Sequence, residues 1–429
     1  MAEPELSLFE GFGVEIEYMI VDDDSLDVRP YCDRVLAAAA GDVTNEVQRG
    51  AVAWSNELTA HLIEIKTNGP APALAPLTDA FATTIGDIEG LLERDGARLL
   101  PGAMHPWMDP EREMLLWPHD YSPIYQAYDR IFDCRGHGWA NLQSVHLNLP
   151  FANDDELHRL HAGIRHLLCL LPALAASSPV ADGRDSGFAD YRLEVYRHNS
   201  RRIPEVTGLV VPEVVDSAAS YRERILLPMY RAIAPLDPQH LLQEEWLNSR
   251  GAIARFDRFA IEIRVLDTQE CPRADLAILG LVVAVLQALL EERFGHLKDL
   301  DTLETGRLKA ILEQCVVHGD EARIEDSPWL STFGLRGKVW ARDLWGHLLE
   351  RCGDLFVATG VDRAPLELIL DQGTLSRRLR QALELPAPGR RIDAFTLVPT
   401  PPAQLPRSAM TDVYRRLADC LRQGSLFHE

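Results

Sequence analysis

The chain has 429 residues, of which 46% are hydrophobic, so it can bury a large core in one large domain or in several smaller ones. Its 65 acidic and 43 basic residues give a net charge of -22, which repels phosphate backbones and anionic lipid headgroups. With no concentrated basic patch, the sequence argues against nucleic acids and membranes as partners. An anionic small-molecule substrate would need local cations or a bound metal ion to reverse the field.

The cysteines point to a reducing compartment. There are seven, an odd number, and none forms a C-x-x-C pair, so neither a disulfide framework nor a zinc ribbon is indicated. The N-terminal sequence MAEPELSLFEGFG lacks the basic and apolar regions of a signal peptide, and we therefore expect a cytoplasmic protein. The longest apolar run, Leu276 to Leu290, is shorter than the roughly 20 residues of a membrane span and contains Gln287, which predicts a buried core helix.

Short segments of alternating character predict strands at 14–21, 61–67, 144–149 and 260–267. Longer segments predict helices at 76–95, 154–176, 218–232, 273–294, 303–318, 337–352, 373–384 and 408–422. The second of these can be capped by Asn153 or Asp154. The order lacks a regular strand-helix-strand rhythm, so we expect an α+β fold in which the last third is mostly helical. We expect a single domain over 1–429, with a sheet core at about 11–290 and a helical region at 291–429.

Two long irregular stretches, 101–139 and 177–216, separate these elements. Both mix aromatic, charged and glycine residues, unlike a low-complexity linker. Loops of this length in compact proteins are usually functional or disordered, and we expect these two to be functional.

The four predicted strands repeat one design. Side chains at i and i+2 lie on the same face of a strand, so each strand has an apolar face and a face with charged or polar side chains. The aligned polar sets are Glu15 with Glu17, Glu64 with Lys66, Ser144 with His146 and Asn148, and Glu262 with Arg264.

This face has two interpretations that periodicity alone does not separate. It could be the solvated side of an antiparallel sheet. However, like charges close together on a sheet are destabilising, and several glutamates with few cations make sense if a divalent cation lies between them. Mg²⁺ and Mn²⁺ prefer carboxylate oxygens and often share their coordination shell with substrate phosphates. His146 could then be a ligand or a phosphate hydrogen-bond donor, and Arg264 and Lys66 could balance a phosphate or carboxylate.

Several common nucleotide-binding and hydrolase motifs are absent: the Walker loop, the Rossmann G-x-G-x-x-G, the G-x-S-x-G elbow and H-E-x-x-H. Other segments form an ordered set: FGVEIEYMIVD, HLIEIKT, QSVHLNLPF, SSPVADGRDSGF with RHNSRRIP, and FAIEIRVLDTQECPRADLAI. Together they resemble glutamate-cysteine ligase family 2, the bacterial carboxylate-amine ligase branch, over roughly 11–290. The resemblance implies a glutamine-synthetase-like antiparallel sheet that forms a funnel with helices outside and binds ATP with about two or three Mg²⁺ ions.

The resemblance also implies roles for individual residues. The metal ligands fall on Glu15, Glu17, Glu57, Glu64, His146 and Glu262. For cofactor binding the resemblance gives Arg264 and Arg201, and the polar face itself adds Lys66 and Asn148. Among these, Glu17, His146 and Arg264 are expected to be catalytic. Arg201 and Arg202 can equally well be an exposed basic turn.

The expected reaction is the ATP- and Mg²⁺-dependent joining of a carboxylate to an amine through an acyl phosphate, with glutamate and cysteine, as in glutathione biosynthesis, as the first guess. One alternative is a phosphotransferase of the guanidino-kinase type, because analogy of fold does not fix the reaction. Another is a non-catalytic protein that binds Mg-ATP or a metabolite. The partners are small molecules, and the oligomeric state, homo-oligomer included, is left open.

Overall fold

The structure is a computed structural model that describes residues 6–389 and 403–428. Its main sheet has eight strands, all antiparallel, in the order β2-β3-β4-β1-β6-β10-β9, with β5 also pairing with β1. These strands are β1 (Gly13–Asp22), β2 (Glu46–Arg49), β3 (Val52–Asn56), β4 (Leu62–Thr67), β5 (Ala97–Leu100), β6 (Ser144–Pro150), β9 (Ala252–Arg255) and β10 (Ala260–Asp267). There are two further, two-stranded sheets: β7 (Val180–Ala181) with β8 (Arg184–Asp185), and β11 (Arg323–Ile324) with β12 (Val339–Trp340).

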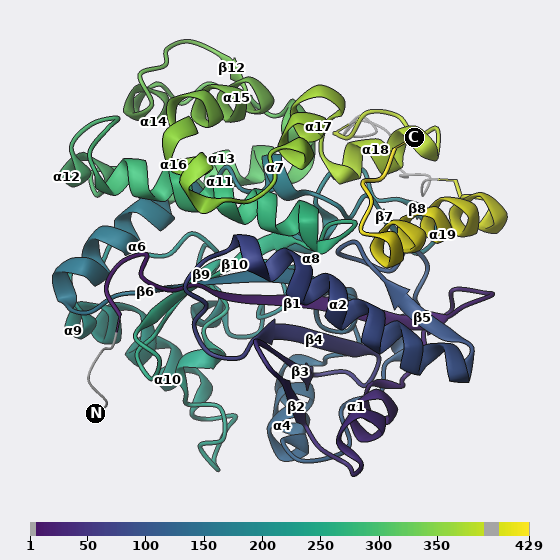
Figure 1. Ribbon diagram of the computed structural model, residues 1–429. Coiled ribbons are helices and arrows are strands. Elements are labelled where there is room, and N and C mark those ends of the chain that lie inside the picture. The colour runs from purple at the N-terminus through teal and green to yellow at the C-terminus, as the bar shows by residue number, and fades with distance from the viewer. Residues whose placement is uncertain (1–5, 390–402, 429) are drawn as a thin grey trace, which may run out of the picture.

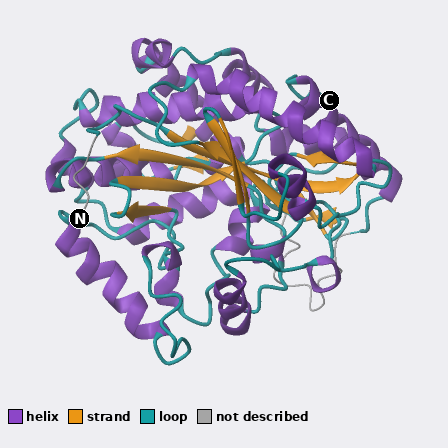
Figure 2. Ribbon diagram, turned by 60° about the horizontal axis from the view of Figure 1, so that its bottom comes forward, coloured by secondary structure: helices purple, strands orange, loops and turns teal. Residues whose placement is uncertain are grey.

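Helices lie on both sides of the sheet (Figures 1 and 2). Those of the first half are α1 (Cys32–Ala40), α2 (Ala75–Leu92), α3 (Pro110–Glu113), α4 (Ser122–Phe132), α5 (His137–Ala140), α6 (Asp154–Leu168), α7 (Pro172–Ala175) and α8 (Tyr191–Tyr196). Those of the second half are α9 (Ala218–Tyr221), α10 (Leu227–Ile233), α11 (Pro272–Leu290), α12 (Leu297–Leu300), α13 (Thr305–His318), α14 (Ser327–Thr332), α15 (Ala341–Arg351), α16 (Gly353–Thr359), α17 (Ala364–Gln372), α18 (Leu375–Ala382) and α19 (Arg407–Gln423). The predicted α+β fold with a mostly helical last third is confirmed.

Helix α11 is the central core helix. By length and composition it could cross a membrane, but 89% of its most apolar window is buried inside the structure. It packs against α2 and α6 on one side and against α16 and α17 on the other (Figure 1). The prediction of a buried core helix is confirmed, since neighbouring helices cover its apolar surface. All seven cysteines are free and buried.

Three helix boundaries differ from the prediction. The helix expected at 154–176 is capped by Asn153, whose side chain accepts from the backbone of Glu156, but α6 ends at Leu168 and a separate turn, α7, begins at Pro172. Proline has no N–H for a preceding carbonyl and crowds the turn before it, so it starts a helix better than it continues one. The segment expected at 218–232 contains a π-helical turn between α9 and α10, and α15 begins at Ala341, after strand β12.

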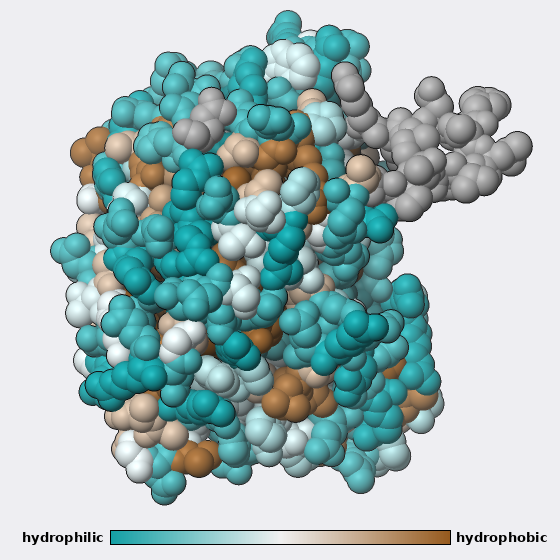
Figure 3. All heavy atoms as spheres, turned by 90° about the vertical axis from the view of Figure 1, so that its right-hand side faces the viewer, coloured by the Kyte–Doolittle hydropathy of each residue, from teal (hydrophilic) through white to brown (hydrophobic). Residues whose placement is uncertain are grey.

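One hydrophobic core extends from Phe12 to Phe427, so the helical last third shares its packing with the sheet. On the face shown in Figure 3 hydrophilic residues predominate and apolar ones are scattered, as a net charge of -22 leads one to expect.

Candidate active site

Adjacent strands place the predicted glutamates on one face of the sheet. Glu17 on β1 lies opposite Glu64 on β4, and Glu15 lies opposite His146 on β6. The next strand, β10, carries Glu262. Directly opposed residues of antiparallel strands project to the same side, so these five side chains share what we call the acidic face.

The acidic face is buried. The exposed fractions are 8% for Glu17, 6% for Glu64, 6% for His146 and 3% for Glu262. These values exclude the interpretation of a solvated sheet face. Buried carboxylates are costly unless they bind a proton, a cation or several hydrogen-bond donors, so the arrangement requires a compensating partner.

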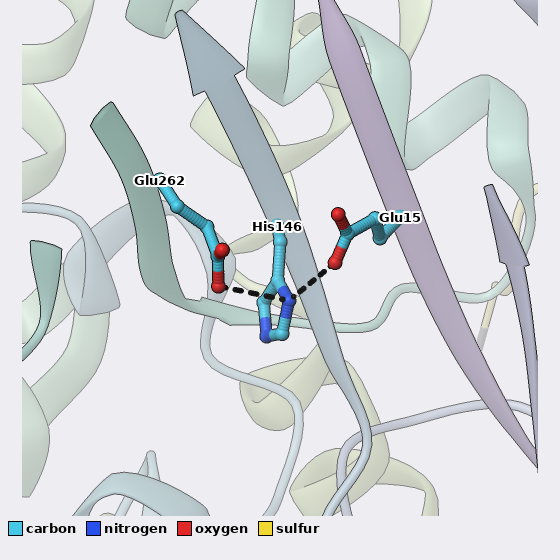
Figure 4. A group of neighbouring side chains, drawn as sticks. All are labelled: Glu15, His146 and Glu262. Atoms are coloured by element: carbon cyan, nitrogen blue, oxygen red, sulfur yellow. Dashed lines mark hydrogen bonds and ion pairs between the residues drawn. The ribbon is translucent and has the colours of Figure 1, made fainter. Parts of the chain in front are cut away.

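One cluster consists of Glu15, His146 and Glu262, whose ligand atoms all lie within 4.8 Å of one another (Figure 4). Nδ1 of His146 lies 3.1 Å from Oε2 of Glu15 and 3.6 Å from Oε1 of Glu262. Burial alone would lower the pKa of His146, but the hydrogen bond with Glu15 and the charge of Glu262 outweigh it and raise that pKa. Burial alone would raise the pKa of Glu15, but the hydrogen bond with His146 and the charge of that residue outweigh it and lower the pKa of Glu15.

A second cluster consists of Glu17, Glu64 and His146, again with ligand atoms within 4.8 Å. Ser144 donates to Oε2 of Glu17 from its backbone N at 2.7 Å and from its hydroxyl at 3.0 Å. Burial nevertheless raises the pKa of Glu17. Beside this cluster, burial and the charges of Glu64 and Glu17 raise the pKa of Glu57 well above its ordinary value. Without a metal ion, this environment favours the protonated form of Glu57 more than water does.

The two clusters fit hard divalent cations. Their donors are carboxylate oxygens and one imidazole, the set that Mg²⁺ and Mn²⁺ accept. The raised pKa values of Glu17 and Glu57 mark the places where a cation could take over from a proton. His146 belongs to both clusters, with Nδ1 toward Glu15 and Nε2 3.0 Å from the hydroxyl of Ser144. A neutral imidazole has one free nitrogen lone pair, so His146 can serve only one ion at a time.

A larger pocket, of about 520 Å³, opens at one end of the acidic face. Its lining includes Glu15, Lys66, Asn148, Arg258 and Phe259. Nζ of Lys66 lies 3.1 Å from Glu64, and Asn148 donates to Glu15 at 3.2 Å. Two of the predicted cofactor-binding residues therefore line one pocket beside the carboxylates.

A smaller pocket, of about 190 Å³, lies at the other end. Its charged residues are Glu17, Glu57, Arg192 and Arg264, and His146 lies with them. Aromatic side chains form much of the rest, beside the neutral polar residues Ser144, Asn199 and Ser249. Nε of Arg264 lies 3.0 Å from Glu262. Since Glu15 lines the larger pocket and Glu17, two residues along the same strand, lines the smaller one, the carboxylates lie between the two pockets.

Arg201 does not join the other predicted residues. Its side chain is exposed, and it lines neither of these two pockets. Arg202 is also exposed and donates to the carbonyl of Ile131 at 2.7 Å. The exposed basic turn therefore describes both arginines in this structure, and Arg201 lies apart from the other predicted cofactor-binding residues. Both arginines lie in the turn region after α8, where their side chains are exposed.

Sequence reasoning missed Arg192, which lines the smaller pocket and is only 1% exposed. Its Nε donates to Asp267, and its Nη2 has no hydrogen-bond partner among the described residues. Asp267 also accepts from the backbone N of Ser177 at 2.8 Å and the hydroxyl of Ser178 at 2.9 Å. An acidic residue closing the apolar segment AIEIRVLD was the signal that could have revealed a buried cationic partner.

A β-bulge in β10 explains how Asp267 reaches this position. Ile263 pairs with Leu147 and Leu266 with Val145, so β10 uses one residue more than β6 around Arg264. Beyond the bulge, Asp267 lies opposite Ser144, which is on the acidic face. Strict alternation would have placed Asp267 with Ile263 on the apolar face.

Comparisons with known proteins identify relatives of this chain. The model of glutamate-cysteine ligase family 2 matches residues 11–382. A protein of unassigned function from Archaeoglobus fulgidus is 38% identical over 280 residues, covering 65% of this chain and 75% of that protein.

Two solved structures share the fold. The glutamate-cysteine ligase of Francisella tularensis, solved in complex with AMP, has a TM-score of 0.57 at 11% identity, covering 98% of this chain and 90% of that one. The bifunctional glutathione synthetase of Pasteurella multocida has a TM-score of 0.56 at 14% identity, covering 96% of this chain and 53% of that one. The family match extends over most of the described residues, including every strand of the acidic face. The chain belongs to glutamate-cysteine ligase family 2 and is a carbon-nitrogen ligase of the carboxylate-amine type.

Proposed function

We propose that the chain is a single catalytic unit that uses ATP and Mg²⁺, or Mn²⁺, to join a carboxylate to an amine through an acyl phosphate. The observation that carries this proposal is the buried set of carboxylates around His146 between two pockets. A ligase of this type must hold the terminal phosphate of a nucleotide next to the carboxylate of an acid. The acidic face, which lies between the two pockets, is the place where the two groups could meet.

Metal ions would be held by the two clusters. Glu15, His146 and Glu262 would hold one ion, and Glu17 and Glu64 of the second cluster, together with the neighbouring Glu57, would hold another. When bound, the ions would neutralise phosphate oxygens and so favour transfer of the terminal phosphoryl group. Lys66 and Arg264 add positive charge on either side, which offsets the repulsion expected from a net charge of -22.

The nucleotide belongs in the larger pocket. Only this pocket of the two has the size for a nucleotide, and it offers Lys66 and Arg258 for phosphate oxygens and the ring of Phe259 for a base. Its position would direct the terminal phosphate toward Glu15. The Francisella tularensis enzyme was solved in complex with AMP, which supports a nucleotide site in this fold.

The acid belongs in the smaller pocket, where Arg192 and Arg264 can hold a carboxylate. A carboxylate oxygen attacks the terminal phosphorus and ADP leaves. The amine then attacks the acyl carbon, and phosphate leaves. Arg264 would stabilise the charge on the transferred group, and no covalent bond to the protein is needed.

Glutamate and cysteine are the reference substrates, because the family is named for them. The reaction is tested with purified protein, Mg-ATP, and a panel of acids and amines, by following ADP release, free phosphate and product mass. A ligase releases ADP and phosphate only with both an acid and an amine. A phosphotransferase would instead accumulate a stable phosphorylated product, and a binding protein would release no ADP.

The matched variants are Glu17→Gln and Glu223→Gln. Glu17→Gln keeps the shape of the side chain but removes a buried charge between Glu64 and His146, so ADP release should fall by at least about 100-fold while the protein stays folded. Glu223 is exposed and lines neither pocket, so its variant should turn over normally. Normal turnover by Glu17→Gln would refute the assignment.

A further inference from the structure

The smaller pocket has largely apolar walls. Tyr128 packs against Trp139 and Trp246, with ring centroids 5.4 Å and 5.9 Å apart, and all three rings line the pocket. Leu58 and Leu142 add aliphatic surface. The body of a ligand in this pocket would contact mainly aromatic and aliphatic carbon, and such contacts favour apolar groups over charged ones.

The charged groups of this pocket are few and already paired. Arg192 is bound to Asp267 and Arg264 to Glu262. The unpaired Nη2 of the buried Arg192 is left as a donor for a ligand carboxylate, and Nε of Arg264, although close to Glu262, also makes no hydrogen bond among the described residues. The only carboxylates in the lining are Glu17 and Glu57, both assigned to metal ions. The ammonium group of an α-amino acid would therefore lack a free anionic partner in the lining, and a buried, unpaired ammonium is costly.

The size of the pocket sets a further limit. It measures about 190 Å³, whereas a cavity of about 150 Å³ in another protein binds one benzene molecule. The space therefore fits one ring or one short branched chain with its carboxylate. It does not fit two amino acids side by side.

We propose that the acid activated by this chain is a compact monocarboxylic acid with an apolar body, aromatic or branched, instead of an α-amino dicarboxylic acid such as glutamate. The carboxylate lies between the metal clusters and Arg192, and the body lies against Tyr128, Trp139 and Trp246. This inference rests on the proposed function, and it changes only the substrate.

The test replaces the unknown amine with hydroxylamine. The carboxylate oxygen forms a bond to the terminal phosphorus as the bond to ADP breaks. The nitrogen of hydroxylamine then bonds to the acyl carbon, the bond from that carbon to the phosphate oxygen breaks, and nitrogen loses a proton. One acid, one ATP and one hydroxylamine give one hydroxamate, one ADP and one phosphate, and ferric ion reports the hydroxamate by colour.

The acids to compare are benzoate, phenylacetate, 3-methylbutanoate and glutamate. We expect kcat/KM for the best of the three apolar acids to exceed that for glutamate by at least tenfold. Preference for glutamate would overturn the inference and leave the proposed ligase intact. If no acid gives hydroxamate or acid-dependent ADP, the proposed function fails and the inference fails with it.

A binding measurement separates the pocket from the chemistry. Without ATP, the preferred acid should change the tryptophan fluorescence of the wild type and raise its melting temperature. Trp139→Leu should raise KM for that acid at least tenfold while KM for ATP changes less than twofold. Trp340 is exposed on β12 and lines neither pocket, so Trp340→Leu is the matched control. An unchanged KM for the acid in Trp139→Leu would contradict the placement of its body.

Discussion

The Asp267–Arg192 pair gives the sharpest prediction, because two nearly inaccessible charges face each other beside the smaller pocket. Their side chains are 0% and 1% exposed. Burial and the charge of Asp267 raise the pKa of Asp190 well above its ordinary value, and the ion pair of Arg192 is made with Asp267. Asp267→Asn leaves the charge of Arg192 buried without that partner.

Breaking one side of a buried ion pair costs about 3–5 kcal/mol, and we expect Asp267→Asn to lower the free energy of unfolding by about that amount. Urea denaturation followed by fluorescence measures it, if unfolding is two-state. The double variant Arg192→Met with Asp267→Asn should recover at least about 1 kcal/mol, because no unbalanced charge remains. The matched control is Glu367→Gln, which breaks the exposed pair with Arg363 and should cost about 0.5 kcal/mol or less.

The same variants test the role of the pair in substrate binding. Arg192→Lys keeps a positive charge but loses the guanidinium nitrogen Nη2 that is left to bind the acid. KM for the acid should therefore rise about tenfold while KM for ATP stays within about twofold. The reasoning would be refuted by a loss below about 1 kcal/mol in Asp267→Asn, or by equal changes in both KM values in Arg192→Lys.

Three further predictions concern other parts of the chain. Lys66→Met should raise KM for ATP about tenfold and leave KM for the acid unchanged in steady-state kinetics, because Lys66 lines the larger pocket and not the smaller one. The folded-state pKa of Glu57 is raised above its unfolded value near 4.5, so its stabilisation is complete below pH 4.5 and is lost as pH rises through the folded pKa. In EDTA, the melting temperature of Glu57→Gln should therefore fall less than that of the wild type as pH rises above 4.5. Saturating Mg²⁺ should remove that difference between the two proteins. Equal falls of the melting temperature in EDTA would contradict the raised pKa of Glu57. Leu281→Ala in α11, where Leu281 is fully buried, should cost about 2–5 kcal/mol in urea denaturation, and a loss under about 1 kcal/mol would argue against α11 as the core helix.

Local alternation predicted the part of the site that depends on one strand at a time. The direction of a side chain along a strand follows from the pleat, so Glu15 with Glu17, and His146 with Asn148, could be assigned to one face without knowledge of the partner strands. The resemblance then ordered the strands into one ligase sheet. Both steps depend on sequence pattern within short segments, which is why they needed no tertiary information.

The sequence by itself determined which side chains could share the acidic face, but only the tertiary structure decided what surrounds them. The smaller pocket beside that face is walled by residues of α4 and α5 and by Trp246, which are distant in sequence from β1 and β4. The bulge in β10 depends on its pairing with β6, and it is this pairing that turns Asp267 toward Arg192. Arg201 and Arg192 lie in the same irregular stretch, and the path of the backbone alone exposes the first and buries the second. Contacts between distant segments carry no periodic signal, so the two pockets beside the carboxylates could be recognised only in the folded chain.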